Sequence, residues 1–322
     1  MCKRILITGA AGFIGSHLAE ELLKSGYKVL GIDNFDDFYP KAYKEANLKL
    51  LLSNSSFEFV TGDFGNEADL NRFSNKPDII IHLAAKAGVQ PSLQAPANYI
   101  ETNIAKTNNL LEWMRKQQIK KLVFASSSSV YGNTLEIPFK ETQDVGQPVS
   151  PYAFSKRSCE LMNYTYHQLY NFDIINLRFF TVYGERQRPD LVIHKFVAKI
   201  LKNEPIHLYG DGSTSRDYTY WADTVKGIIA AMKLVDTGVN IFEIINLGNN
   251  SPVTLQELVD NIGEVMQVKP QIVYEGKKPG DVDITYADIT KAKILLGYSP
   301  DTALKTGLSN FLQWYKEINK TS

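Results

Sequence analysis

The chain of 322 residues has no excess of charge of either sign and very few cysteines. Because 35 basic residues balance 35 acidic ones, no general basic field exists to attract nucleic acid or an anionic membrane surface. The two cysteines, Cys2 and Cys159, are too few for a disulfide framework, which favours a reducing compartment. We therefore expect a cytoplasmic protein that has neither nucleic acid nor a membrane as its partner.

Long apolar runs are also missing. No stretch approaches the roughly 18 apolar residues that a membrane-spanning helix needs. Residues 4–8 are apolar, but glycines follow at once, in place of the longer apolar core of a signal peptide. We predict neither a membrane span nor a signal peptide, and we identify no motif for a metal site.

The first half of the chain alternates short apolar runs with helical patterns. Short strands that are apolar throughout and separated by helices are typical of a parallel sheet covered on both faces. Strands are expected at 4–8, 28–32, 57–61, 78–82, 121–125 and 173–178. Helices are expected at 13–25, about 40–52, 66–73, 96–117 and 152–170. The pattern predicts an α/β fold with a doubly wound parallel sheet of the Rossmann type.

The pattern changes beyond about residue 180. Turn-rich segments, such as 184–189 and 210–215, separate shorter elements, and helices are expected at 221–234, 254–266 and 302–318. We predict a main domain at 1–180 and a smaller C-terminal α/β lobe at 181–322, some segments of which return to the first domain. The lobe is expected to lie over the carboxyl edge of the sheet, where doubly wound folds bind ligands.

Three glycines lie between the first expected strand and the first helix. Gly9, Gly12 and Gly15 follow a G-x-x-G-x-x-G spacing, which allows a tight turn and close approach of backbone to a pyrophosphate at the helix N-terminus. Asp33 ends the second strand, where a carboxylate can accept both adenine-ribose hydroxyls and repel a 2′-phosphate. This pattern predicts NAD binding. The alternatives are an ordinary glycine-rich turn and a solvated aspartate at a strand end.

The pattern Tyr-x-x-x-Lys occurs twice. Tyr152 and Lys156 open a helix after Pro151, and residues four apart share one helix face. Tyr274 and Lys278 are separated by Gly276 and need not share a face. A phenol is a poor base at neutral pH, and a nearby ammonium stabilises its phenolate, so Tyr152 and Lys156 suit proton transfer. The alternative is a surface pairing of two common residues.

Other polar and small residues follow the remaining strands. A hydroxyl of the cluster Ser126 to Ser129 can relay a proton to Tyr152, unless the cluster is only a polar loop at a strand end. Asp63 is a candidate for the adenine edge. The small residues Leu83, Ala84 and Ala85 leave room for a cofactor beside the backbone.

With these motifs, the chain resembles, from end to end, the extended short-chain dehydrogenases/reductases of the nucleotide-sugar epimerase and dehydratase group. Among them it is most similar to UDP-glucuronate 4-epimerases. The supporting stretches are Asp33-Asn34-Phe35 with the Tyr/Lys-rich insert after it, 82–89, 178–184, 186–190, 215–220 and 285–288.

The resemblance implies roles for individual residues. Tyr152 is the catalytic base, Lys156 its activator and a nicotinamide-ribose ligand, and Ser127 the hydroxyl beside Tyr152. Ser128, Ser129 and Thr181 face the carbon-5 substituent of the sugar. Arg188 and Arg216 hold the uridine diphosphate, although Arg216 can instead pair with Asp217 or Asp211. Residues expected at NAD are Gly9, Gly12, Phe13, Ile14, Gly15, Asp33, Asn34, Asp63, Phe64, Leu83, Ala84, Ala85, Lys86, Asn103, Ser126, Tyr152, Lys156 and Phe179. Residues expected at the UDP-sugar are Gln90, Ser127, Ser128, Ser129, Tyr152, Thr181, Arg188, Arg216 and Asp281.

Three reactions share this scaffold, and the residues before Val130 separate them. Dehydratases of the group carry Thr-Asp-Glu there and decarboxylases keep a Glu, whereas this chain has three serines, 127–129. Without a carboxylate for elimination or decarboxylation, epimerisation at carbon 4 through a transient 4-keto sugar remains. The resemblance also implies a homodimer in which the helices at 96–117 and 152–170 form a four-helix bundle.

One position departs from the family pattern. Relatives commonly carry arginine after Ala-Gly-Val, where this chain has Gln90, and Lys86 or Lys195 are candidates to compensate. The leading hypothesis is a 4-epimerase of UDP-glucuronate. The runner-up is a 4-epimerase of neutral UDP-hexoses or UDP-N-acetylhexosamines. A hypothesis from another class is an NAD-binding redox sensor, which would not need Tyr152, Lys156 and Ser127 together.

Overall fold

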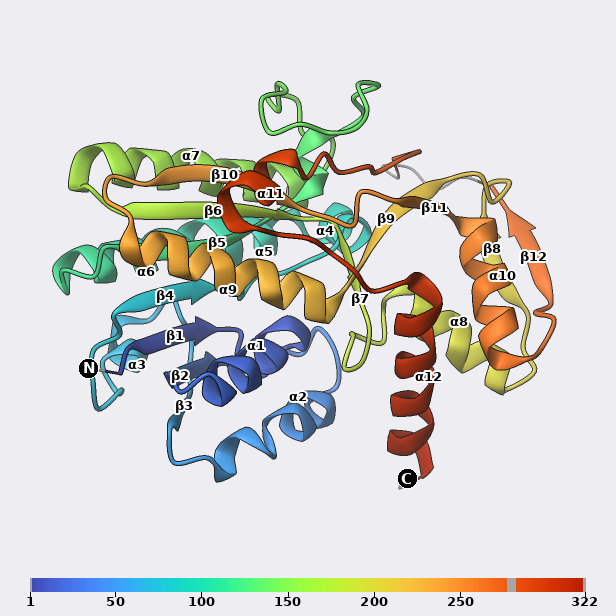
Figure 1. Ribbon diagram of the computed structural model, residues 1–322, viewed down its shortest axis with the longest axis horizontal. Helices are drawn as coiled ribbons and strands as arrows, with labels where there is room; N and C mark the ends of the chain where they lie inside the picture. The colour runs from blue at the N-terminus through green and yellow to red at the C-terminus, as the bar shows by residue number, and fades with distance from the viewer. Residues whose placement is uncertain (1, 277–281, 321–322) are drawn as a thin grey trace.

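Seven parallel strands form the centre of the computed structural model, which describes residues 2–276 and 282–320 (Figure 1). The order across the sheet is β10-β6-β5-β4-β1-β2-β3, and each neighbouring pair runs parallel. The strands are β1 (Arg4–Thr8), β2 (Lys28–Asp33), β3 (Phe57–Thr61), β4 (Ile79–His82), β5 (Lys121–Ser127), β6 (Asp173–Phe179) and β10 (Phe242–Leu247). The six strands expected in the first 180 residues are confirmed, and β10 adds a seventh that the sequence pattern did not predict.

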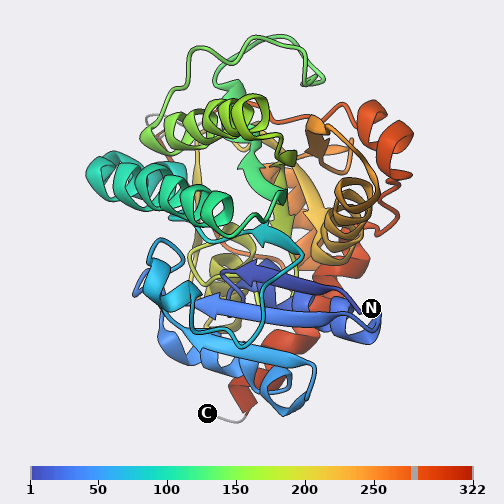
Figure 2. The same cartoon turned by 90° about the vertical axis from the view of Figure 1, so that its left-hand side faces the viewer.

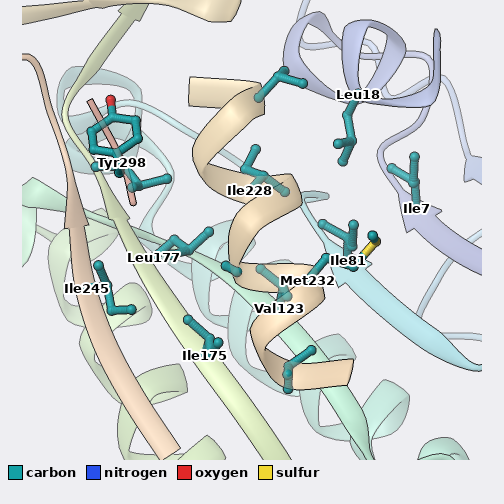
Figure 3. Packing of buried hydrophobic residues seen from close by; sticks show 14 of the residues in the cluster. Ile7, Leu18, Ile81, Val123, Ile175, Leu177, Ile228, Met232, Ile245 and Tyr298 are labelled. Atoms are coloured by element: carbon teal, nitrogen blue, oxygen red, sulfur yellow. The ribbon is translucent and has the colours of Figure 1, made fainter. Parts of the chain in front are cut away.

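Alternating side chains of the strands fill two separate cores. Ile5 and Ile7 of β1 point to one face, and Leu6 points to the other. The same alternation places Ile81 and Val123 on the first face, where Figure 3 shows them around the helix that carries Ile228 and Met232. Both faces of the sheet are therefore buried, which is why its strands are apolar along their whole length.

Helices cover each face of the sheet. On one face lie α1 (Phe13–Lys24) and α9 (Trp221–Thr237), which share a core with the sheet. On the other lie α6 (Lys106–Lys116) and α7 (Pro151–Tyr170), side by side in Figures 1 and 2. The remaining elements of this half are α2 (Lys41–Leu48), η1 (Leu51–Ser53), α3 (Glu67–Leu70), α4 (Val89–Gln94) and η3 (Ser128–Tyr131).

The helix expected over 96–117 is interrupted. It consists of α5 (Pro96–Tyr99), a π-helical segment η2 (Ile100–Ala105) and then α6. Wider π turns inside helices frequently mark functional sites. Here the segment contains the buried Asn103, whose side chain bonds to the backbone of Lys86.

A second, smaller group of elements lies to the right in Figure 1. Its core joins the three-stranded sheet β11-β9-β7, the pair β12-β8 and three helices. These elements are β7 (Thr181–Tyr183), α8 (Val192–Leu201), β8 (Ile206–Tyr209), β9 (Ser215–Tyr220), β11 (Pro252–Thr254), α10 (Leu255–Met266), β12 (Ile272–Glu275) and α12 (Leu304–Lys320).

The chain crosses between the two groups more than once. Beyond residue 180, α9 returns to cover the large sheet, β10 pairs with β6 along its edge, and α11 (Thr290–Leu296) packs beside β10. The large sheet is therefore built from both halves of the sequence. None of the helices within the described ranges combines the length and the apolar character that crossing a bilayer requires.

Gly15, on the first turn of α1, packs directly against the turn before the helix. A Cβ at this position would lie 2.1 Å from the carbonyl oxygen of Gly9. We expect Gly15→Ala to lower the free energy of unfolding by about 1–3 kcal/mol, because the turn must shift to relieve the clash. Denaturant titration measures the change. In the control Gly276→Ala the new Cβ meets nothing within 4 Å, so a change below about 0.5 kcal/mol is expected. Equal loss in both variants would contradict this account.

Candidate functional site

A cavity of about 470 Å³ lies at the carboxyl edge of the large sheet, where the loops after β1, β2, β4 and β5 meet. Most of the predicted site residues line it. They are Gly9, Gly12, Phe13, Ile14, Gly15, Asp33, Asn34, Asp63, Phe64, Leu83, Ala84, Ala85, Lys86, Ser126, Ser127, Ser128, Ser129, Tyr152, Lys156, Phe179, Thr181, Arg188 and Arg216. Gln90, on α4, and Asn103 are not among the described lining residues, and Asp281 lies outside the described residues.

The glycine loop forms a tight turn between β1 and α1. Gly9 has a φ of 73°, and a Cβ on it would lie 3.1 Å from the backbone of Ala84. The Gly9 N–H donates to the carbonyl of Ile32 at 2.9 Å, which ties the turn to β2. Gly12 is the N-cap of α1 and supplies no side chain to its first amides. Backbone can therefore approach a pyrophosphate closely at this helix N-terminus.

Asp33 at the end of β2 is buried rather than solvated. Its carboxylate accepts the N–H groups of Phe35, at 2.9 Å, and Ala11, at 3.2 Å. The ammonium of Lys44, also buried, lies 3.4 Å from the same carboxylate. The simple solvated aspartate considered above is therefore wrong. The sequence pattern marks the Tyr/Lys-rich insert that contains Lys44, but it does not predict that Lys44 pairs with Asp33.

Two further ion pairs cross the cofactor end of the cavity. Lys106 of α6 lies 2.5 Å from Asp63, after β3. Lys86, after β4, lies 2.9 Å from Asp36 in the insert. Asn103 holds the loop of Lys86 by bonding to both its N–H (2.8 Å) and its carbonyl (2.9 Å). Asn103, one of the residues expected at the cofactor, thus holds the loop of Lys86 in place and does not itself line the cavity.

Tyr152 and Lys156 lie one turn apart at the start of α7. Ser150 caps this helix by accepting the N–H of Ala153 at 3.1 Å, and Pro151 opens the first turn. The second match lies elsewhere: Tyr274 on β12 is exposed and donates to the side chain of Gln256 at 3.0 Å. Lys278 lies outside the described residues. The fold therefore brings only the first pair to the cavity among the residues described.

The electrostatics of the pair differ from the simple expectation. Burial raises the pKa of Tyr152, against the hydrogen bond of Ser127 and the positive charge of Arg188, which both lower it. The ammonium of Lys156 donates to the carbonyl of Ala125 at 2.7 Å. Burial lowers the pKa of Lys156 to about 8, while Cys159 and Glu160 act to raise it. Arg188 is thus a charged residue that lowers the pKa of the phenol, an effect that sequence spacing does not reveal.

A group of hydroxyls surrounds the end of β5. Ser127 accepts hydrogen bonds from the N–H and hydroxyl of Ser129, at 3.2 and 3.0 Å. The Ser127 hydroxyl also acts on Tyr152, whose pKa it lowers. Ser128 and Thr181 line the cavity beside them. These hydroxyls can donate to or accept from oxygens of a sugar near Tyr152.

Two arginines approach the cavity from the smaller lobe. Arg188 forms a two-point ion pair with Asp190, at 2.8 and 2.9 Å, and its guanidinium stacks over Phe38 at 5.1 Å. Arg216, on β9, donates to the carbonyl of Ser215 at 2.8 Å. Asp217, one of the alternative partners of Arg216, is buried and accepts backbone N–H groups of residues 249, 250 and 287.

The site residues fit a bound dinucleotide. Glycine backbone lines one end of the cavity where side chains would fill it, and the carboxylate of Asp33 lines the same end. Tyr152, Lys156 and the serine cluster line the other end. The arrangement can therefore hold a cofactor beside a polyhydroxylated substrate.

Comparison with known proteins agrees with this geometry. A UDP-glucuronate 4-epimerase of Thermodesulfobacterium geofontis is 41% identical over 315 residues, covering 97% of this chain and 96% of that protein. The crystal structure of a UDP-glucuronic acid 4-epimerase from Bacillus cereus, in complex with UDP-glucuronic acid and NAD, superposes with a TM-score of 0.90 at 36% identity. It covers 98% of this chain and 99% of that one.

A UDP-glucose 4-epimerase from Thermotoga maritima, crystallised with UDP-glucose, superposes with a TM-score of 0.88 at 33% identity, and the coverage is again 98% and 99%. The model of the NAD dependent epimerase/dehydratase family matches residues 5–248. With its seven-stranded parallel sheet, glycine turn and Tyr152–Lys156 pair at one cavity, this chain belongs to the NAD-dependent epimerase/dehydratase family.

Proposed function

We propose that this protein interconverts UDP-glucuronate and UDP-galacturonate. The protein is an NAD-dependent UDP-sugar 4-epimerase, as the family match and its relatives support. UDP-glucuronate is the proposed substrate because the relatives named for it are 41% and 36% identical, against 33% for the UDP-glucose 4-epimerase. A cytoplasmic location is part of the proposal, since both cysteines are unpaired.

One observation carries the reaction type: the serines at the end of β5 line the same cavity as Tyr152. Among the described residues that line the cavity, the carboxylates belong to Asp33, Asp36 and Asp63, which follow β2 and β3 at the cofactor end. Beside Tyr152 the lining consists of the serines 127–129 and Thr181. Proton transfer by the phenol, without a carboxylate to drive elimination, supports epimerisation.

The proposed chemistry assigns each group a step. Tyr152 accepts the proton of the sugar 4-hydroxyl and returns it after the 4-keto sugar has presented its other face. Ser127 relays that proton, and Arg188 lowers the pKa of the phenol. Lys156, one turn along α7, is assigned a second positive charge that favours the phenolate. Bound NAD supplies a reversible hydride acceptor, so the overall reaction has no net oxidation.

The hydroxyl lining also bears on the choice of substrate. A 4-keto uronic acid is a β-keto acid and readily loses carbon dioxide. Ser128, Ser129 and Thr181 suit a site that holds the carboxylate away from the alignment required for that loss. Neutral UDP-hexoses remain a second candidate, because Gln90 replaces the arginine common in relatives and a UDP-glucose 4-epimerase is also similar.

A panel of UDP-sugars tests the substrate. We expect the kcat/KM for UDP-glucuronate to be higher than that for UDP-glucose or UDP-N-acetylglucosamine. Chromatography of the products measures each reaction. Carbon dioxide and UDP-pentose should form far more slowly than UDP-galacturonate. Faster turnover of a neutral sugar would transfer the proposal to the second candidate. Pentose formed as fast as galacturonate would overturn the role of the hydroxyls.

Replacement of the phenol tests the catalytic base. Tyr152→Phe should reduce kcat by at least about 10²–10⁴-fold, because the ring still packs but no longer accepts a proton. Binding of UDP-sugar, measured by calorimetry, should change little. Lys156→Met should be almost as damaging.

The matched control is the second tyrosine. Tyr274→Phe removes an exposed hydroxyl that donates to Gln256 on the surface of the smaller lobe, and kcat should be nearly unchanged. An inactive Tyr274→Phe beside an active Tyr152→Phe would show that the base is assigned to the wrong residue.

The outer face of α7 supports a homodimer. Phe154, Leu161 and Tyr164 are between 46% and 54% exposed, and their spacing of seven and three residues places them on one helix stripe. The helix runs beside α6 on the same side of the molecule (Figure 2). We propose that the two helices pack against their symmetry mates as a four-helix bundle.

A charge in this stripe tests the dimer. The parent protein should have the mass of a dimer in light scattering at micromolar concentration, and Leu161→Glu should shift it toward the monomer. Ile294→Glu is the matched control, because Ile294 is 75% exposed but lies on α11. A monomeric parent protein would refute the proposal.

A further inference from the structure

Glu160 is a buried carboxylate on the catalytic helix that has no part in the steps above. It lies four residues after Lys156 and eight after Tyr152, so all three occupy one face of α7. Its side chain is inaccessible to solvent and accepts four hydrogen bonds. The donors are Ser126 Oγ at 2.6 Å, Arg178 Nε and Nη2 both at 2.9 Å, and Arg157 Nη1 at 3.1 Å.

These donors connect three elements at the wall of the cavity. Ser126 and Arg178 are the next-to-last residues of β5 and β6, and the two are direct neighbours in the parallel register. Glu160 therefore ties α7 to both strand ends at once. The strand that it holds ends at Ser127, whose hydroxyl lowers the pKa of Tyr152. Glu160 itself is not among the described lining residues of the cavity.

The carboxylate also bears on the charge of Lys156. Burial raises the pKa of Glu160, but its bonds from Arg178, Ser126 and Arg157 outweigh burial and bring the pKa below the ordinary value. Glu160 is thus an anion at neutral pH. Lys156 lies over the ring of Phe124 and donates to the carbonyl of Ala125, but its burial disfavours the ammonium and lowers its pKa. The negative charge one turn away opposes this effect.

Other ionisable groups face the pair from neighbouring elements. His82 of β4 is buried with a pKa of about 3 and stays neutral in the working range. Burial raises the pKa of Cys159 to about 11 and that of Tyr99, on α5, to about 12. Arg188 faces the phenol with a permanent positive charge. Arg178 and Arg157 are positively charged. Of all these groups, Glu160 is the one that contributes a negative charge near Lys156.

We propose that Glu160 is a positioning residue that sets both the place and the charge of Lys156. It acts through the β5–β6 strand ends for the place and through its anionic carboxylate for the charge. Arg178 is the counter-ion that keeps this carboxylate ionised inside the protein. The proposal rests on the assignment of Tyr152 and Lys156 as the proton-transfer pair, and it holds for whichever UDP-sugar is preferred.

The pH profile of kcat tests the electrostatic part. Glu160→Gln removes a negative charge and leaves Arg178 uncompensated. The protonated forms of Lys156 and Tyr152 both become less favourable, so both pKa values should fall. We expect both limbs of the profile to move to lower pH by about one unit, the scale on which a neighbouring charge acts. The holoenzyme is assayed with NAD present, and bound NAD and the unfolding midpoint are recorded for each variant.

Two further variants separate charge from packing. Glu160→Gln combined with Arg178→Gln removes one charge of each sign, so the limbs should return toward their parental positions even if kcat remains low. Arg157→Gln removes a partly exposed positive charge beside Glu160, so the basic limb should move to higher pH. This variant tests the proposal even if Glu160→Gln alone does not fold.

The outcomes are distinct from failure of the proposed function. The electrostatic role would be overturned if Glu160→Gln lowered kcat without moving either limb of its pH profile. An unmoved basic limb in Arg157→Gln would also overturn it, and a purely structural role would remain. An active Tyr152→Phe would instead overturn the assignment of the catalytic pair. Limbs that shift in opposite directions in the two single variants, and return in the double variant, support the proposal.

Discussion

All seven strands of the large sheet run in the same direction, and the position of every functional group depends on this. Parallel strands end at one edge, so the glycine turn, Asp33, the loop of Lys86 and the serine cluster meet there although they are far apart in the sequence. The sheet can be built this way only because helices bury both of its faces. The cavity is thus a consequence of strand direction together with burial.

The helix α7 brings the proposed proton-transfer pair to this edge. Its first two turns carry Tyr152 and Lys156, and buried Glu160 ties it to β5 through Ser126 and to β6 through Arg178. Buried ion pairs add little net stability, because both charges must lose their hydration, but losing one partner costs about 3–5 kcal/mol. Such a pair fixes geometry more than it stabilises the fold. The Glu160–Arg178 pair lies one turn beyond Lys156 along α7, where it can fix the position of the lysine.

The smaller lobe completes the site from the opposite side. Arg188 reaches the cavity on the turn after β7, stacks on Phe38 of the insert, and acts on the phenol of Tyr152. The chain then returns through α9 and β10 to the large sheet. Because the chain crosses between the two groups of elements, substrate-side and cofactor-side residues belong to one connected structure.

Sequence alone determined the six strands of the first half, the glycine turn, and which described Tyr-x-x-x-Lys pair opens a helix at the cavity, because these follow from local periodicity and spacing. The family and its reaction also followed from motifs. Tertiary structure decided the rest: the seventh strand β10, the burial of Asp33 against Lys44, and the position from which the charge of Arg188 lowers the pKa of Tyr152. These depend on segments distant in sequence meeting in space. Local patterns cannot specify such interactions, since the same residues in the same local sequence could also lie on a solvated surface.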